Sequence, residues 1–371
     1  MSPDSIDPGA DDWPPEPRKN PDLTGQERAE RAFLDAYLSR RLPHAWLITG
    51  PRGVGKATLA HRIARFLLVH GRLGSSGPGG DEGPGLFGDD LPGTDPESLA
   101  TDLQHLVCRR VTAGGHTDFM LIKREINEKT GRLHRDISVD SVRAIGHFLS
   151  LTPGEGGWRV VVIDAADEMS ASAANAVLKV LEEPPARSVL LLVSHNPGRL
   201  LETIRSRCRH LPLPPLGPDA MAGLLGRHAP DIGSDERDVL LHLAGGSIGR
   251  ALRLAGEGGV DLYAQMRALL ATLPHLDIGA LHKLGDLVAR DRGGDRFRTI
   301  AELIDWWLVG QSRDKSRDSS GGDGGGGGGL EGWFGVWEKT NRLFREAEDL
   351  NLDRKQVVLE VFLSIEDAAR G

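Results

Sequence analysis

The chain has 371 residues, of which 39% are hydrophobic and 26% are charged, and its formal net charge at pH 7 is −8. This length supports two or three domains with cores of their own, and no apolar run reaches the roughly 18 residues that a membrane-spanning helix needs. The negative net charge argues against a protein that coats nucleic acid nonspecifically. A basic groove shared with partner subunits would, however, not show in the net charge of one chain. We therefore expect a soluble protein that does not associate with a membrane.

The N-terminus and the cysteines give no sign of export or of a metal site. The stretch MSPDSIDPGADDWPPEP is acidic and proline-rich and lacks the apolar core of a signal peptide, so a cytoplasmic location is the default expectation. Residues 1–22 are predicted to form a disordered tail, with structure beginning near Leu23. Cys108 and Cys208 are too few for a disulfide framework or a four-thiolate zinc site, and zinc is not expected.

The first elements follow the order of a phosphate-binding loop. Residues 25–41 carry apolar side chains at helical spacing, and residues 45–50, AWLITG, are typical of a short buried strand. That strand runs directly into GPRGVGKAT and then into a second helical pattern. Strand, glycine-rich loop and helix N-terminus in this order favour phosphate binding.

The glycine loop has the main parts of a nucleotide site but lacks one. Its glycines let the backbone turn its N–H groups inward, and its lysine can reach a β- or γ-phosphate. The next residue should supply a hydroxyl to magnesium, yet it is Ala57, and Thr58 lies about 100° further round the helix. ATP is therefore at most weakly bound, and the alternative is a loop retained for its shape alone. The candidate nucleotide-site residues in this loop are Gly50, Gly53, Gly55 and Lys56.

A second candidate part of the site follows the apolar run of residues 160–163. This run is typical of a strand covered on both faces of a parallel sheet, and it ends at Asp164, where P-loop proteins hold magnesium. The same aspartate can instead cap a turn. Hydrolysing proteins of this architecture continue with a glutamate that polarises water, but here the next residue is Ala165, and Asp167 and Glu168 lie beyond the strand end. Hydrolysis at this site is not expected.

The remaining segments of this half alternate between strand and helix patterns. Residues 71–105, rich in Gly, Pro and Asp, are predicted to be a mobile insertion. Residues 119–122 and 189–193 are predicted strands, and residues 137–149 are a predicted helix. The last strand ends in Ser194, His195 and Asn196, which indicates either a γ-phosphate sensor or a simple turn.

Four motifs in this order resemble one known family. They are GPRGVGK at 50–56, VVVIDAADEM at 160–169, NAVLKVLEEPP at 175–185 and IRSRC at 204–208. Together they resemble the AAA+ clamp-loader subunits of bacterial DNA polymerase III, from about Leu23 to Leu254 and more faintly beyond. The resemblance implies an α/β P-loop AAA+ core with a parallel sheet in residues 23–213. It further implies a small helical lid domain in 214–257 and an all-α collar domain in 258–371, in which residues 311–332 form a Gly-rich loop.

Departures from the motifs favour one class within that family. Ala57 and Ala165 stand where hydrolysing gamma or tau subunits have a hydroxyl and a carboxylate, and Gly249 stands at their second sensor arginine. With SRC intact, the chain is similar to the non-hydrolysing delta-prime class. Arg207 would then act as an arginine finger in trans, and the alternative is a surface arginine paired with a carboxylate such as Glu202. The family's four-cysteine zinc module is reduced to a single cysteine here.

The resemblance also implies partners and a function. The chain would join gamma/tau and delta subunits in a heteropentamer that loads the sliding clamp onto primed DNA during DNA replication. It would be a subunit of the DNA-directed DNA polymerase III holoenzyme, a nucleotidyltransferase, without stand-alone ATPase or polymerase activity. Two alternatives stay open at this point. One is an autonomous or gamma/tau-like AAA+ ATPase acting on DNA, and the other is a structural adaptor.

Overall fold

The chain forms two compact units in the computed structural model. The first unit comprises Met1–Leu224 with Gly246–Gly249, and the second comprises Leu225–Gly245 with Arg250–Gly371. The residues that the structure describes are 16–71, 95–127, 131, 133–155, 157–256, 258–291, 295–319, 327–350 and 352–370.

A five-stranded sheet, parallel throughout, forms the centre of the first unit. Its strands lie in the order β2-β3-β4-β1-β5. Every residue of β3 and β4 is buried, which explains their continuous apolar sequences. The strands are β1 (Ala45–Thr49), β2 (Phe119–Ile122), β3 (Arg159–Ile163), β4 (Ser188–Ser194) and β5 (Arg209–Pro212). The predicted strands are thus confirmed, and β5 is added at the sheet edge.

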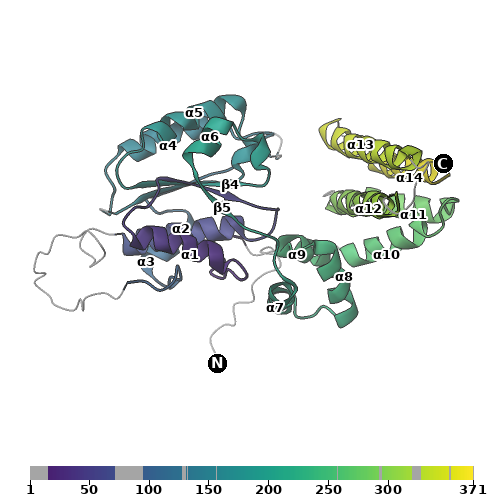
Figure 1. The fold of residues 1–371 in the computed structure, drawn as a ribbon, viewed down its shortest axis with the longest axis horizontal. Coiled ribbons are helices and arrows are strands. Elements are labelled where there is room, and N and C mark those ends of the chain that lie inside the picture. The colour runs from purple at the N-terminus through teal and green to yellow at the C-terminus, as the bar shows by residue number, and fades with distance from the viewer. Residues whose placement is uncertain are drawn as a thin grey trace, which may run out of the picture. The chain divides into compact units, whose positions relative to one another are not determined.

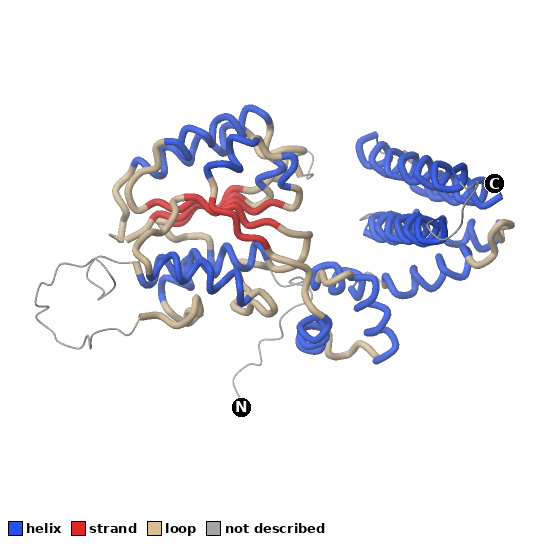
Figure 2. The backbone as a smooth tube through the Cα atoms, viewed as in Figure 1, coloured by secondary structure: helices blue, strands red, loops and turns tan. Residues whose placement is uncertain are grey.

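Helices cover both faces of this sheet (Figure 1). One layer contains α1 (Glu27–Leu38), α2 (Lys56–His70) and α3 (Leu106–Ala113), and the other contains α4 (Val139–Ser150), α5 (Ala171–Glu182) and α6 (Glu202–Arg207). The strands lie between the two layers (Figure 2). Because side chains alternate along a strand, Trp46 and Ile48 join the core under α1 and α2, while Leu47 joins the core under α4, α5 and α6. Two short 3₁₀ turns, η2 (Ala166–Glu168) and η3 (Pro197–Arg199), follow β3 and β4, and α7 (Pro218–His228) follows β5.

The second unit is helical in the part of it that the structure describes. Within it, Phe297 of α12 packs edge-on against Phe344 of α13 at 5.1 Å between ring centroids. The buried Glu366 of α14 accepts hydrogen bonds from the backbone N–H of Leu276 at 2.9 Å and from Arg370 at 2.7 Å. The helices that follow α7 are α8 (Ser234–Ala244), α9 (Ile248–Gly256), α10 (Gly259–Leu270), α11 (Ile278–Ala289), α12 (Asp295–Ser319), α13 (Gly327–Leu350) and α14 (Arg354–Arg370).

The structure differs from the prediction of a disordered tail over residues 1–22. Residues 1–15 lie outside the described residues, but from Glu16 onward the chain is tied to α2. Arg65, which is 1% exposed, donates to the carbonyl oxygens of Arg18 at 3.0 Å and Asn20 at 3.1 Å. A buried guanidinium must find acceptors, and this requirement orders the segment.

Two predicted loops also differ in part. Residues 72–94 of the predicted insertion lie outside the described residues, but in the remainder Leu99 is fully buried and belongs to the core under α1 and α2. The predicted Gly-rich loop at 311–332 is helical up to Ser319 and again from Gly327, while residues 320–326 are not described. The prediction extended the loop of the later glycine run back to residue 311. Residues 311–319 contain Gln, Arg and Lys, which are good helix formers, and they continue α12.

Candidate functional site

The predicted glycine loop connects the carboxyl end of β1 to the N-terminus of α2. Gly53 and Gly55 have positive φ angles of +75° and +98°, a conformation that residues with a side chain rarely adopt. Space is limited as well, because a Cβ atom on Gly53 would lie 2.4 Å from Ser247 Oγ. The sequence pattern therefore corresponds to a backbone shape that depends on its glycines.

The loop lysine is used inside the loop itself. Lys56 is only 3% exposed, and its Nζ donates to the carbonyl oxygen of Gly50 at 2.7 Å and to that of Pro51. Burial lowers the Lys56 pKa to about 8, against the opposing effect of Asp167 and Asp164. The ammonium group is thus held by the carbonyl oxygens of its own loop.

A short segment from later in the first unit closes over the loop. Ser247 Oγ donates to the carbonyl oxygen of Arg52 at 2.7 Å, and the backbone N–H of Gly249 donates to that of Gly53 at 3.0 Å. A Cβ atom on Gly249 would lie 2.8 Å from Gly53 Cα, closer than real Cβ atoms approach such a neighbour. Glycine at 249 therefore permits direct backbone contact, a role that the sequence alone did not indicate.

Asp164 lies beside this loop, as the sequence predicted. Its backbone N–H donates to the carbonyl oxygen of Ile122 at 2.8 Å, directly after β3. Burial raises the pKa of its carboxyl, while the N–H of Ala165 and the charges of Lys123 and Lys56 act in the opposite direction. Of the loop residues that the sequence selected, Lys56 is the one whose charge acts on Asp164.

The neighbouring carboxylates have partners of their own. Asp167 accepts hydrogen bonds from the backbone N–H groups of His195 at 2.9 Å and Asn196 at 3.1 Å, so the polar end of β4 forms an anchored turn. Burial alone would raise the Asp167 pKa, but the backbone N–H of His195, with its own N–H and the Ser194 side chain, holds it below its usual value. Glu168 binds Arg52 at 2.8 Å and Arg124 at 2.6 Å. Both side chains therefore connect segments of the fold.

Histidine 195 completes the polar surroundings of the loop. Burial lowers its pKa to about 4, and the charges of Lys56 and Arg52 lower it further, in spite of Asp167. The imidazole is therefore neutral at physiological pH. The neutral imidazole therefore adds no further positive charge near Lys56 and Arg52.

Arg207 lies apart from the loop, in the other helical layer, where it ends α6. Its Nη2 lies 2.9 Å from Glu182 Oε1 at the end of α5, and its Nη1 donates to the carbonyl oxygen of Thr203 at 3.1 Å. The carboxylate that the sequence suggested as a local partner was Glu202, so Glu182 is a correction. No spacing rule could have identified it, because the contact depends on how α5 and α6 pack.

Two buried residues fix the orientation of α6. Ile204 is fully buried and Cys208 is 8% exposed, and both join the core that includes Leu181 of α5. Burial raises the Cys208 pKa to about 12, which makes the thiol an inert anchor. With Ile204 and Cys208 turned inward, Arg207 is directed outward, and its side chain is 38% exposed.

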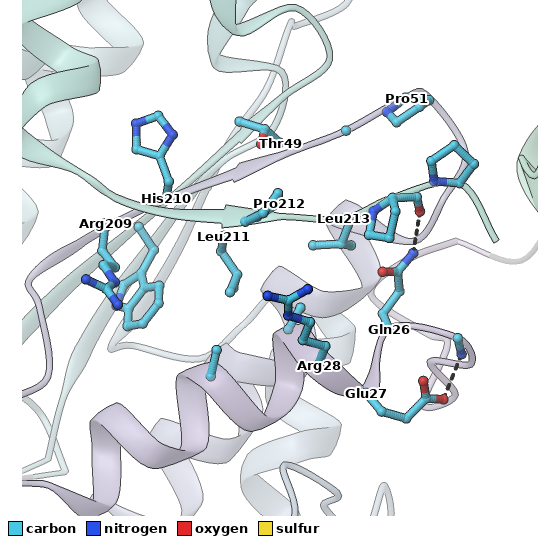
Figure 3. Close-up of a pocket in the computed structure, with 17 residues that line it drawn as sticks. Gln26, Glu27, Arg28, Thr49, Pro51, Arg209, His210, Leu211, Pro212 and Leu213 are labelled. Carbon is cyan, nitrogen blue, oxygen red and sulfur yellow. Dashed lines mark hydrogen bonds between the residues drawn. The ribbon is translucent and has the colours of Figure 1, made fainter. Parts of the chain in front are cut away.

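A cavity of about 550 Å³ lies between the start of α1, β5 and the first loop residues (Figure 3). Of the predicted site residues only Gly50 lines it. Gln26 closes one end by donating to the carbonyl oxygens of Pro214 at 2.9 Å and Val54 at 3.2 Å, and Glu27 accepts from the N–H of Gly25 at 2.8 Å. This cavity is therefore separate from Lys56 and Asp164.

Metal ligands and membrane-spanning elements can be assessed over the described ranges only. There, no three His, Cys, Asp or Glu side chains are grouped so as to hold a metal ion. Cys108 and Cys208 are both buried free thiols. Nor is any helix in those ranges long and apolar enough to cross a bilayer.

Comparison with known proteins gives consistent matches. A family model described as DNA polymerase III, delta subunit, matches residues 87–217. The DNA polymerase III subunit delta' of Pseudomonas aeruginosa is 37% identical over 223 residues, which cover 60% of this chain and 59% of that protein. The subunit delta' of Escherichia coli is 31% identical over 274 residues, covering 73% and 72%. That of Bacillus subtilis is 29% identical over 220 residues, covering 59% and 54%.

The matched segments therefore span less than two thirds of the Pseudomonas and Bacillus proteins but more than two thirds of the Escherichia coli protein. Among solved structures, a gamma subunit-related protein of Thermotoga maritima is 18% identical and covers 94% of this chain and 100% of its own, with a TM-score of 0.40. The predicted α/β core with a parallel sheet is confirmed, as is a helical C-terminal region. On the identity and coverage of the Escherichia coli match, the chain belongs to the DNA polymerase III subunit delta' family.

Proposed function

We propose that this chain is the delta-prime subunit of a clamp loader, whose own nucleotide site is inactive and whose Arg207 serves the ATP site of a neighbouring subunit. The single observation that carries the proposal is a contrast between two cations. Lys56 is buried and bonded to its own loop, whereas Arg207 is exposed at the end of a short helix.

The state of the loop supports an inactive site. The ammonium group of Lys56 donates to loop carbonyls, and Gly249 contacts Gly53 where the resemblance calls for a sensor arginine. Ala57 and Ala165 supply neither a magnesium-binding hydroxyl nor a water-activating carboxylate. Each of these features independently disfavours turnover, and the missing magnesium ligand at Ala57 also weakens any binding of ATP.

The environment of Arg207 supports a role toward another molecule. Its guanidinium is a planar fork suited to bidentate contact with phosphate, and an arginine supplied in trans accelerates phosphoryl transfer by roughly 10³- to 10⁵-fold. Its side chain is 38% exposed at the end of a short helix, so the guanidinium can be reached from outside the subunit.

The wider proposal follows from the family. The chain would work in the cytoplasm as one member of a heteropentamer with gamma/tau and delta subunits, and it would reach the sliding clamp and primed DNA through that complex. Residues 23–213 would serve as the AAA+ core, 214–257 as a lid and 258–371 as the oligomerising collar. Catalysis would belong to the assembled holoenzyme.

The decisive experiment compares two arginines at the same edge. In a reconstituted assembly with gamma/tau and delta subunits, Arg207→Ala should leave assembly intact but lower the ATP hydrolysis that DNA and clamp stimulate. Arg209→Ala removes an equal charge two residues away and should change the rate by less than about twofold, as expected for an exposed charge. An Arg207→Ala assembly that hydrolyses ATP and loads clamps at the unmodified rate would refute the role in trans.

A second candidate function, an ATPase acting on DNA with its own nucleotide, has one specific observation in its favour. The glycine loop keeps the backbone shape set by Gly53 and Gly55, and subunits named tau or gamma/tau also match this chain at 25–26% identity. Turnover by the isolated chain would separate the two functions, because only this second candidate requires it.

A further inference from the structure

The arginine on which the proposed function depends already has an ion-pair partner within the chain. Arg207 Nη2 lies 2.9 Å from Glu182 Oε1, and the two side chains are 38% and 52% exposed. The second bond of the guanidinium, from Nη1 to the carbonyl oxygen of Thr203, stays within α6. Glu182 is therefore the contact that ties Arg207 to another element of the fold.

The position of this pair is set by rigid elements. Glu182 is the last residue of α5, directly after the buried Leu181, and Arg207 is the last residue of α6, directly before the buried Cys208. Leu181 and Cys208 belong to the same core. The two charged side chains consequently stand side by side at the surface whenever this core is packed.

The strength of the pair permits exchange. Exposed ion pairs hold their partners only weakly, because solvent screens the charges and both side chains lose conformational freedom. Arginine bound bidentately to a phosphate makes stronger, charge-assisted bonds. A triphosphate brought to this edge can thus take the guanidinium from the carboxylate, and Glu182, whose side chain is 52% exposed, is then left to solvent.

We propose that Glu182 is a reversible latch on Arg207, which holds the guanidinium inside the subunit and releases it to the γ-phosphate of a nucleotide held by a neighbouring subunit. This inference rests on the proposed role of Arg207 in trans and adds a regulatory residue to it. In the resting assembly the latch keeps the neighbouring site incomplete. In the DNA- and clamp-bound assembly the closer approach of the nucleotide opens it.

The test uses the reconstituted assembly and a matched pair of substitutions. Glu182→Gln removes the charge of the latch, and Glu183→Gln makes the same change at the next residue, which is also exposed. Glu182→Gln should raise ATP hydrolysis without DNA and clamp by about two- to fivefold, as expected for loss of a weak ion pair. The maximal stimulated rate should change by less than about twofold, since the latch is then already open.

A double-mutant cycle separates the latch from a general effect of charge. In an Arg207→Ala background, Glu182→Gln should have no effect on either rate, because the residue that it restrains is gone. The melting temperatures of the isolated variants and their incorporation into the assembly should match those of the unmodified chain.

The outcomes distinguish the two proposals. If Arg207→Ala lowers the stimulated rate while Glu182→Gln behaves like Glu183→Gln, the latch is overturned and the role of Arg207 stands. A lower resting rate with Glu182→Gln would likewise overturn it, since the carboxylate would then orient the arginine productively. If Arg207→Ala changes nothing, the proposed function fails and the latch fails with it.

Discussion

Lys56 and Arg207, both in the first unit, differ in what surrounds them. Lys56 is buried at the carboxyl edge of the sheet, and its hydrogen bonds go to the loop that carries it. Arg207 stands at the surface, fixed at its base by Ile204 and Cys208 and held at its tip only by Glu182 and one carbonyl oxygen. One cation is thus committed to the internal structure, and the other can change partners.

The difference lies in what each side chain and its surroundings are bonded to. In the loop, the backbone N–H of Gly249 donates to the carbonyl oxygen of Gly53, and Lys56 donates to the carbonyl oxygens of Gly50 and Pro51. An arginine that acts on a neighbour needs only an anchored helix and an exposed end. Ile204, Cys208 and the exposed end of Arg207 meet this requirement, which is why we propose the role in trans.

The largest expected effect concerns turnover by the isolated chain, for which we predict no ATP hydrolysis above background. Ala57 and Ala165 lack the magnesium ligand and the water-activating group, and Lys56 is bonded to its loop. Steady-state phosphate release by the purified chain checks this, with Lys56→Ala as the matched variant. Turnover that disappears in Lys56→Ala would show that the loop is an active site and would remove the contrast.

The next effect sharpens the contrast at Arg207. Arg207→Lys should restore little of the stimulated ATP hydrolysis lost in Arg207→Ala, because a single ammonium cannot reproduce the planar fork of a guanidinium. The same measurement on the assembly checks it, with Arg31→Lys on α1 as a control at an exposed arginine. A lysine variant that works at the unmodified rate would mean that charge alone is sufficient at this position.

A smaller effect is expected where the loop is closed. Gly249→Ala should destabilise the chain by about 1–3 kcal/mol, since its Cβ atom would be forced against Gly53 Cα. Gly223→Ala in α7 is the control, because nothing lies within 4 Å of its added Cβ, and helix propensity predicts a gain of up to about 1 kcal/mol. Urea unfolding midpoints compare the two variants. Equal midpoints would show that the contact with Gly53 is not tight.

The smallest effect is a pH dependence in the same helix that begins at Lys56. Burial lowers the pKa of His61 to about 4, and the charges of Arg65, Arg18 and Lys123 lower it further. The unfolded chain binds a proton near pH 6.5, so between about pH 6.5 and 4 it binds more protons than the folded chain, and stability falls as the pH falls.

His61→Phe should therefore make the free energy of unfolding depend less steeply on pH. His195 also has a pKa of about 4, so the substitution should remove about half of the pH-dependent destabilisation that the two histidines cause together. The ring of Phe119 lies 5.6 Å from that of His61, so an aromatic replacement keeps similar packing. Urea midpoints at pH 7 and pH 5 measure the slope, with the exposed His147→Phe as the control. An unchanged slope in His61→Phe would contradict the assignment.

Much of the first unit follows from local pattern. Continuous apolar runs predicted β3 and β4, because strands buried on both faces have no polar positions to alternate with. The glycine loop was predicted because its positive φ angles require glycine at Gly53 and Gly55, and Asp164 was expected near it because strand ends meet at one edge of a parallel sheet. These features depend on neighbours within a few residues, or on a rule that holds for every parallel sheet.

Other features depended on packing between distant segments. The ordering of residues 16–20 follows from the burial of Arg65, and the segment around Leu99 joins the core although its composition suggests a loop. A composition argument counts how much apolar surface a segment has. It does not include the hydrogen-bond acceptors that a buried guanidinium in another segment, here that of Arg65, requires.

The sequence by itself determined four strands of the sheet and the shape of the glycine loop, because hydrophobic period and glycine placement encode them locally. Only the tertiary structure decided that Lys56 would be satisfied by carbonyl oxygens, that Gly249 would contact Gly53, and that Glu182 would hold Arg207. The physical reason is that each of these contacts joins groups whose distance is fixed by helices packing on a shared core, and spacing along the chain carries no measure of that distance.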